Sequence, residues 1–308
     1  MILCAGEALI DLIPDDAGAA HPFVGGAVLN TAVALGRLGQ DVALLTGLSS
    51  DCYGQLIEKT LAESHVSTAL AVRSDRPTTL AAVTLQDGQA VYEFRDEGSA
   101  LRDLTIDDLP PPPAGVTALF FGGISLCNPP VADALAAYAA THARNHLTML
   151  DPNLRPGFAD DEATYVARLK SMLAVADIVK LSDEDLALLY PDLEKDAGLA
   201  AVLASGPKLA FLTLGAEGAE AIHVNGCRVT VPGHAVTVAD TVGAGDTFNA
   251  GTLARAAQLG LLDKASIDAW GTDQIEPLLR LGTAASAITV SRAGANPPWA
   301  QDLQGFEI

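Results

Sequence analysis

The segment 240–251 carries the residue types and spacing best suited to chemistry in this chain of 308 residues. Gly243, Ala244 and Gly245 precede an alanine-rich stretch that predicts a helix, and free amides at a helix start bind anions such as phosphate. Asp246 follows directly, where the helix dipole favours its ionised form. A carboxylate beside a phosphate site repels the ligand unless it has a task, such as accepting a proton from an attacking hydroxyl. A helix N-cap is the alternative interpretation of Asp246.

A second set of candidate residues lies in the first thirty positions. Gly25 and Gly26 permit a ligand to approach the backbone closely, and Asn30 follows in the first turn of a predicted helix. The Asn30 amide offers a donor and an acceptor, which suits a polyhydroxylated ligand. Asp11, after the first predicted strand, can bind sugar hydroxyls. The alternatives are a purely structural turn at the glycines and a solvated Asp11.

Polar residues also follow two predicted strands, at the sheet edge where ligands of open α/β sheets gather. Asn153 and Arg155 follow the apolar run 147–150, and Arg155 is one of few cations placed to face a site. Residues 182–185 follow the run 178–181 and can serve a hydrated Mg²⁺. A surface arginine and an acidic helix start are the alternatives at these positions.

The hydrophobic pattern predicts the scaffold that positions these residues. Short apolar runs alternate with longer helical stretches, which indicates strand–helix–strand units and parallel strands covered on both faces. The predicted strands are Ile2–Ala5, Val42–Leu45, 118–121, 147–150, 178–181 and 209–214, with 236–238 approaching the glycine-rich turn as a strand. A hairpin is predicted around Asn225-Gly226.

The segment 79–94 interrupts this alternation. It consists of two extended runs around an Asp87-Gly88 turn, which predicts a β-hairpin. A hairpin inserted into an α/β chain usually forms a flap or a subdomain. We therefore expect a single domain over residues 1–308, with lid strands at roughly 12–24 and 70–100.

The composition excludes several kinds of partner. Eighteen Lys and Arg against 38 Asp and Glu give a formal net charge of -20, whereas binding to nucleic acid rests on basic residues that neutralise phosphates. An anionic membrane surface is disfavoured for the same reason, and no apolar run reaches the ~18 residues of a membrane span. Four scattered cysteines and an N-terminus without a signal-peptide pattern predict a cytoplasmic protein with reduced thiols.

These segments together resemble the ribokinase/PfkB family of carbohydrate kinases over the whole chain. One family signature is similar to Gly25-Gly26 with Asn30 and Leu38-Gly39, and a second is similar to the segment 240–251. The resemblance implies a ribokinase-like three-layer α/β/α sandwich with a mainly parallel central sheet and a small β-sheet lid. It also implies transfer of the γ-phosphoryl group of ATP to a sugar hydroxyl.

The same resemblance implies a role for each matching residue. Asp246 would be the general base, and the amides of Gly243, Ala244 and Gly245 would form the anion hole. Sugar contacts are expected at Asp11, Gly25, Gly26, Asn30, Arg95, Asn153 and Arg155, nucleotide contacts at Lys180, Ser182, Asp185, Thr213, Gly215, Gly218 and Gly282, and a K⁺ site at Asp240, Val242, Thr289 and Gly294. The implied cofactors are ATP and Mg²⁺, with K⁺ frequent in the family, and family members often pair their lids into homodimers.

Two positions depart from the family pattern. The Asn-x-x-Glu motif near Mg²⁺ is replaced here by Ser182 and Asp185. Fructokinases tend to carry an aromatic residue where this chain has Arg95, whereas Arg followed by Ser99-Ala100 resembles 2-keto-3-deoxygluconate kinases, since Arg suits a substrate carboxylate. The segments 151–158, 179–186 and 291–300 resemble bacterial fructokinases. We therefore expect a kinase that makes D-fructose 6-phosphate, with a 2-keto-3-deoxygluconate kinase and a non-catalytic sugar or nucleotide sensor as the alternatives.

Overall fold

A computed structural model describes residues 1–15, 18–86, 89–306 and 308 of the chain. Several of its strands coincide with short, fully buried apolar runs in the sequence, such as Ile2–Ala5 and Leu147–Asp151. The strands are β1 (Ile2–Ala5), β2 (Leu9–Pro14), β3 (Ala20–Gly25), β4 (Val42–Leu45), β5 (Gly47–Ser49), β6 (Val66–Ser67), β7 (Val72–Ser74), β8 (Leu80–Gln86), β9 (Gln89–Arg95), β10 (Ala118–Gly122), β11 (Leu147–Asp151), β12 (Ile178–Ser182), β13 (Leu209–Thr213), β14 (Ala219–His223) and β15 (Arg228–Val231).

Nine strands form one large twisted sheet, in the order β15-β14-β13-β12-β11-β10-β1-β4-β6. The strands from β13 to β6 are parallel. At the other edge β14 and β15 pair antiparallel, as the Asn225-Gly226 turn predicts. The mainly parallel sheet confirms the α/β class expected from the alternation of apolar runs and helices.

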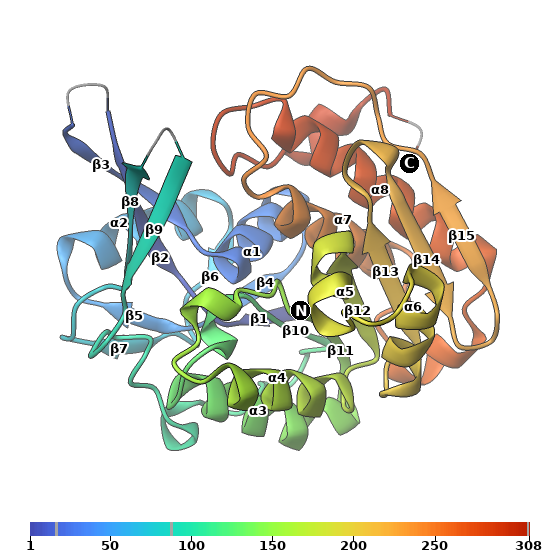
Figure 1. The fold of residues 1–308 in the computed structure, drawn as a ribbon, viewed down its shortest axis with the longest axis horizontal. Helices are drawn as coiled ribbons and strands as arrows, with labels where there is room; N and C mark the ends of the chain where they lie inside the picture. Colours follow the sequence, from blue (N-terminus) through green and yellow to red (C-terminus); the bar gives the residue numbers. More distant parts are fainter. Residues whose placement is uncertain (16–17, 87–88, 307) are drawn as a thin grey trace.

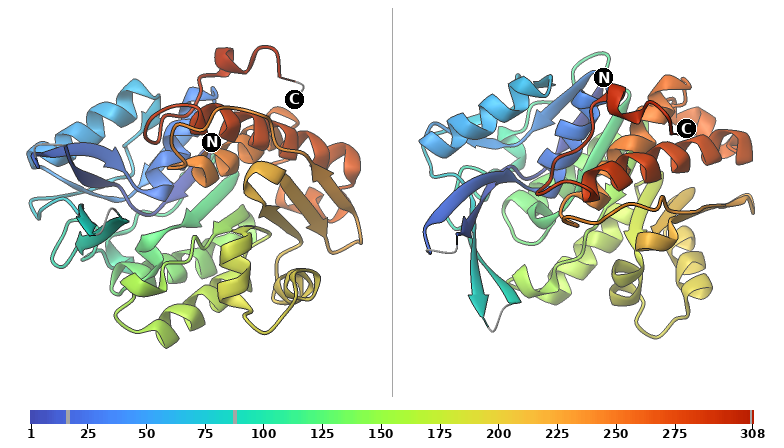
Figure 2. Two further views of the ribbon diagram at one scale, coloured as in Figure 1. Left: turned by 45° about the horizontal axis from the view of Figure 1, so that its top comes forward. Right: turned by 90° about the horizontal axis from the view of Figure 1, so that it is seen from above.

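Helices cover both faces of this sheet (Figures 1 and 2). They are α1 (Ala27–Arg37), α2 (Cys52–Glu63), α3 (Val131–His142), α4 (Glu162–Leu173), α5 (Asp183–Leu189), α6 (Lys195–Ala204), α7 (Ala244–Gln258) and α8 (Thr272–Val290). Alternate side chains of each strand point to opposite faces, so Ile2 and Cys4 pack with α1, α2, α7 and α8. Leu3 and Ala5 pack on the other side with α3, α4, α5 and α6. The result is a three-layer sandwich.

A second sheet projects from the side of the sandwich (Figure 1). Its four strands follow the order β3-β2-β8-β9, and β8 pairs with β9 as an antiparallel hairpin. The Asp87-Gly88 turn that predicted this hairpin lies outside the described residues. Strand β7, which also falls within the expected lid range, instead pairs with β5 in a two-stranded sheet. We call the sheet β3-β2-β8-β9 the lid.

The prediction of a strand at 236–238 is wrong. The chain from 232 to 240 has no regular secondary structure. Val238 is 59% exposed, and with Val236 it lines a cavity rather than pairing with a neighbouring strand. Within the described residues, no helix is long and apolar enough to cross a membrane.

Candidate active site

The start of helix α7 is built around a backbone position that only glycine readily adopts. Gly243 is the N-cap of α7 with φ +78°, in the left-handed region. A Cβ at this position would also lie 2.9 Å from the Cβ of Ala295. Asp246 therefore occupies the third position of the helix and is not its N-cap, so the capping interpretation of Asp246 is wrong.

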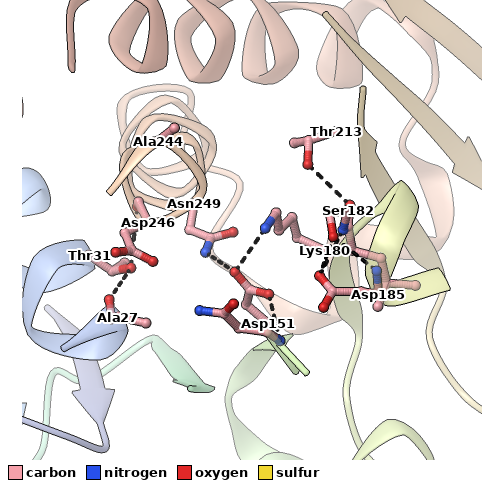
Figure 3. Close-up of polar contacts among 12 residues, drawn as sticks. Ala27, Thr31, Asp151, Lys180, Ser182, Asp185, Thr213, Ala244, Asp246 and Asn249 are labelled. Carbon is pink, nitrogen blue, oxygen red and sulfur yellow. Dashed lines mark hydrogen bonds and ion pairs between the residues drawn. The ribbon is translucent and has the colours of Figure 1, made fainter. Parts of the chain in front are cut away.

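Asp246 is buried at the junction of α7 and α1, with 7% of its surface exposed. Its Oδ2 accepts a hydrogen bond from Nδ2 of Asn30 (2.8 Å), and the Asp246 carbonyl accepts one from Oγ1 of Thr31 (3.3 Å; Figure 3). Helix α1 thus binds both the side chain and the backbone of Asp246.

The pKa of Asp246 differs from the expectation based on the helix dipole. Burial raises this pKa to about 7, against an opposing effect of the Asn30 hydrogen bond. The nearby charges of Asp151 and Glu7 raise it further, whereas Lys180 lowers it. Desolvation outweighs the dipole, and the carboxyl group is poised to exchange a proton near neutral pH.

The predicted sugar-binding residues lie together where the lid joins α1. A Cβ on Gly25 would lie 2.2 Å from Oδ2 of Asp11, so the Asp11 carboxylate occupies the space that the glycine leaves open. Burial raises the pKa of Asp11 to about 6. Gly26 is the N-cap of α1 with φ +109° and packs against Glu7. The N–H of Asn30 donates to the carbonyl of Gly26 (2.8 Å), so Asp11, Gly25, Gly26 and Asn30 lie in one region.

The lid register separates Arg95 from this group. Asp11 pairs with Ala81, and Ala81 pairs with Phe94, so these three side chains share one face of the lid. Arg95 pairs with Leu80 on the opposite face. Its side chain is 59% exposed and forms an ion pair with Glu93 at 3.2 Å. Phe94, which contacts the ring of Phe158, lies on the Asp11 face of the lid.

Asn153 and Arg155 follow β11 as predicted, but they are differently disposed. The backbone N–H of Asn153 donates to Oδ1 of Asp151 (3.2 Å), and Asn153 has φ +43°. Arg155 is exposed and donates from Nη1 to the carbonyl of Leu154 (2.8 Å). The Arg155 guanidinium is thus bound to its own loop rather than to the Asp11–Asn30 group.

A cavity of about 540 Å³ opens on the other side of the α7 N-terminus. It is lined by Thr213, Gly215 and Gly218 from one side and by residues of α7 and α8 from the other. Ala244 and Gly245 of the predicted anion hole line it as well. The cavity therefore ends at the helix start that carries Asp246.

Gly282, an expected nucleotide contact, is not among the residues that line this cavity. A Cβ on Gly282 would lie 2.9 Å from the ring of Phe248, and one on Gly251 would lie 2.7 Å from the Cα of Gly282. Gly282 is small because α7 and α8 cross closely at this point. Thr283, Ser286 and Ala287 are the nearby α8 residues that face the cavity.

The side chain of Lys180 extends from strand β12 toward the predicted anion hole (Figure 3). Its Nζ lies 2.9 Å from where a Cβ on Gly245 would be and donates to Oδ2 of Asp151 (3.2 Å). The same carboxylate oxygen accepts a hydrogen bond from Nδ2 of Asn249 (2.6 Å). Burial opposes the charge of Lys180, but Asp151 and Asp185 raise the pKa of Lys180 above its usual value.

Ser182 and Asp185 form a capping box at the start of α5. Asp185 Oδ2 accepts from the N–H and Oγ of Ser182 (2.9 and 2.8 Å), and the Asp185 N–H donates to Ser182 Oγ (3.0 Å). The other carboxylate oxygen accepts from the N–H of Leu154 (2.8 Å). Both oxygens are thus engaged within the protein, as the acidic helix start predicts.

Three of the four predicted K⁺-binding residues lie on two loops that one carboxylate joins. Asp240 accepts hydrogen bonds from the N–H of Val242 (3.0 Å) and of Gly294 (2.9 Å). The Thr289 side chain instead donates within α8 to the Ala285 carbonyl (3.1 Å) and lies 3.0 Å from Oγ1 of Thr247. The loop of Gly294 continues to Ala295, which packs on Gly243.

The three-layer sandwich, the lid and the buried carboxyl group of Asp246 beside a 540 Å³ cavity are typical of a small-molecule kinase. Residues 1–302 match the family described as pfkB family carbohydrate kinase. The chain belongs to this family. It is 45% identical over 271 residues to a fructokinase of Rhizobium leguminosarum bv. trifolii, covering 87% of this chain and 83% of that one.

Solved structures agree with this assignment. Fructokinase from Xylella fastidiosa with bound ATP has a TM-score of 0.88 and 28% identity, over 98% of this chain and 97% of that one. A double mutant of Vibrio cholerae O395 fructokinase, bound to fructose, ADP and a potassium ion, has a TM-score of 0.86 and 27% identity. It covers 99% of this chain and 97% of its own.

Sequence reasoning assigned no role to Asp151, Asn249 or Glu7. Asp151 is the last residue of β11, and its place at the carboxyl end of a parallel strand was the signal for a site residue. Glu7 is buried and accepts from the N–H of Ala27 (3.0 Å) and from Oγ of Ser125 (2.8 Å), so it fixes the start of α1. Asn249 lies three residues after Asp246, and this spacing indicates that both side chains share one face of the helix.

Proposed function

We propose that the chain transfers the γ-phosphoryl group of ATP to D-fructose and releases D-fructose 6-phosphate and ADP. The observation that carries the proposal is the position of Asp246. It is buried, has a pKa of about 7, and is bonded to Asn30 between the Asp11 group and the 540 Å³ cavity. A carboxyl group in that position can take a proton from a sugar hydroxyl as the hydroxyl attacks a phosphoryl group.

Each group of residues has a part in this reaction. Asp11, the backbone of Gly25 and Gly26, and Asn30 orient the sugar. Asp246 orients the attacking hydroxyl and accepts its proton late, because phosphoryl transfer has a loose transition state. The amides at the start of α7 stabilise the charge on the transferred group.

The nucleotide and its ions fit the remaining features. The cavity at Thr213, Gly215 and Gly218 would hold ATP, with its γ-phosphate at the start of α7. The described residues contain no cluster of three His, Cys, Asp or Glu side chains suited to a metal. Mg²⁺ would therefore be held mainly by phosphate oxygens and water, where it neutralises phosphate charge. Carbonyl oxygens of the loops joined by Asp240 would hold K⁺.

The positions of two arginines favour a neutral sugar over a sugar acid. Arg95 lies on the lid face opposite Asp11, and Arg155 is bound to its own loop. A substrate carboxylate would need a cation directed at the sugar site. This geometry argues against 2-keto-3-deoxygluconate, and the buried base argues against a non-catalytic sensor.

A coupled ADP-release assay tests the proposal with fructose, ribose, 2-keto-3-deoxygluconate and adenosine, each at equal concentration. We expect the highest kcat/KM with fructose, and NMR of the product should show phosphate on O6. A higher kcat/KM with 2-keto-3-deoxygluconate would overturn the assignment of substrate. Absence of ADP release with every sugar would overturn the assignment as a kinase.

We also propose a homodimer formed through the lids. Ile13 and Phe23 are large apolar residues on the lid, 42% and 52% exposed. They lie on the same face as Asp11, since Phe23 pairs with Asp11 and Ile13 is two residues further on. Light scattering should give twice the mass of one chain, and Phe23→Ser should shift the protein toward the monomer.

A further inference from the structure

Lys180 brings a buried positive charge to the place where the γ-phosphate of ATP is expected. Its side chain is 6% exposed, and its Nζ lies against Gly245, one of the anion-hole residues. A glycine at 245 leaves room for this approach, since any side chain there would displace the ammonium group. An ammonium in this position can neutralise charge on a phosphoryl group during transfer.

A lysine has four rotatable bonds and needs partners to keep one position in a buried site. Asp151 supplies the opposite charge at 3.2 Å, and Asn249 in turn fixes Asp151 through a 2.6 Å hydrogen bond. The three residues come from β11, β12 and α7, so the cluster joins the sheet to the helix that carries Asp246 (Figure 3). We call Asp151 and Asn249 the lysine clamp.

One polar atom of the lysine clamp has no hydrogen-bond partner in the described part of the chain. Asn249 is fully buried, yet its Oδ1 has no hydrogen-bond partner among the described residues. An unpaired buried acceptor is costly, and such groups are found where a ligand or a moving donor completes the set. Lys180 has N–H donors beyond the one bound to Asp151. The hydrogen bonds among Lys180, Asp151 and Asn249 can therefore rearrange when a phosphate binds.

We propose that Asp151 and Asn249 are positioning residues that hold the Lys180 ammonium against the anion hole, where it binds and neutralises the γ-phosphate. The proposal rests on the kinase function proposed above. It predicts that the clamp distinguishes ATP from ADP, because ADP lacks the phosphate that meets Lys180.

A purely structural ion pair elsewhere in the chain provides a matched control. Asp177 directly precedes β12, and Lys180 is the third residue of this strand. Asp177 is buried, pairs with Lys264, and accepts from the N–H of Thr148 at 2.9 Å. Asp177→Asn therefore removes a comparable carboxylate–lysine pair that does not include Lys180 or an anion-hole residue.

Calorimetry with a non-hydrolysable ATP analogue and with ADP measures the effect without catalysis. We expect Lys180→Met, Asp151→Asn and Asn249→Ala each to lower the ratio of ATP-analogue to ADP affinity by about tenfold, the size of a hydrogen bond to a charged group. Adding Asp151→Asn to Lys180→Met should give no further loss, because the clamp then has nothing to hold. Asp177→Asn should lower Tm and leave the ratio unchanged.

An unchanged ratio in both Asp151→Asn and Asn249→Ala would overturn the proposal, as would losses that add in the double variant. Asn249→Ala retains the Lys180–Asp151 pair and so provides a folded variant if Asp151→Asn does not fold. Because these are binding measurements, they remain decisive if the phosphorylated sugar is not fructose. A wild-type protein that binds neither nucleotide would instead refute the kinase function itself.

Discussion

Replacing Asp246 by Asn should lower kcat and, at alkaline pH, raise the stability of the folded protein. Asn keeps the shape of the side chain and an oxygen that can accept the hydrogen bond from Asn30. It cannot accept the proton of the sugar hydroxyl. We expect kcat to fall by about 10²–10⁴-fold, the usual contribution of a general base.

The same substitution should stabilise the protein at alkaline pH. Raising the pKa of Asp246 from 3.8 to about 7 means that the folded state holds its proton more tightly than the unfolded state does. Stability is therefore lost as pH rises from about 4 to about 7, and the full penalty is roughly 4 kcal/mol. Asn carries no such penalty, so the variant should melt above wild type at pH 8, with a smaller difference near pH 4.5.

Two measurements check this prediction. The coupled ADP-release assay from pH 5.5 to 9 should show wild-type kcat/KM falling on the acid side of about pH 7, as the base becomes protonated. Thermal melts at pH 4.5 and pH 8 give the stability difference. A variant that keeps more than about a tenth of wild-type kcat would refute the role of Asp246 as base. A variant that melts below wild type at pH 8 would refute the attribution of the raised pKa to burial.

Three further perturbations address the remaining parts of the site. Arg95→Ala should change kcat/KM for fructose by less than about fivefold, the size of an exposed ion pair. A much larger loss would contradict the lid register. Replacing K⁺ by tetramethylammonium at constant ionic strength should lower activity, because the loops joined by Asp240 flank the anion hole; equal rates would remove K⁺ from the mechanism. Gly282→Ala should lower the free energy of unfolding by about 1–3 kcal/mol without raising KM for ATP, since its Cβ would meet Phe248. Urea unfolding and ATP titration measure the two effects. A raised KM for ATP with an unchanged free energy of unfolding would instead indicate that Gly282 contacts the nucleotide.

The strands β1, β4, β10, β11, β12 and β13 of the parallel sheet were predictable because each combines two independent signals. A run such as 147–150 is apolar throughout, as a strand covered on both faces must be, and polar residues mark its end. The segment 236–238 has a similar apolar character, but its side chains face a cavity. Local sequence does not distinguish a strand from an extended loop that lines a ligand space.

The candidate site was predictable where one backbone segment carries it, and less so where tertiary contacts decide. Gly243 and Asp246 lie in one turn, so their spacing fixes their relation. Phe94 and Arg95 are neighbours whose side chains point to opposite faces, and only pairing with Ala81 and Leu80 shows which one faces Asp11. The sequence alone does not show that helix α7 packs closely against Gly282.

The chain order of the lid has a consequence for how new specificities can arise. Strands β2 and β3 form an insertion between β1 and α1, and β8 and β9 form a second insertion. The predicted anion hole at 243–245 lies more than a hundred residues after β9. Asp246 beside it is bonded to Asn30 and Thr31 of α1, the helix that follows β3. Mutations within these two insertions can therefore change the proposed sugar contacts while the residues at the start of α7 stay unchanged. A library confined to residues 9–25 and 80–95 is the economical place to select for acceptors other than fructose.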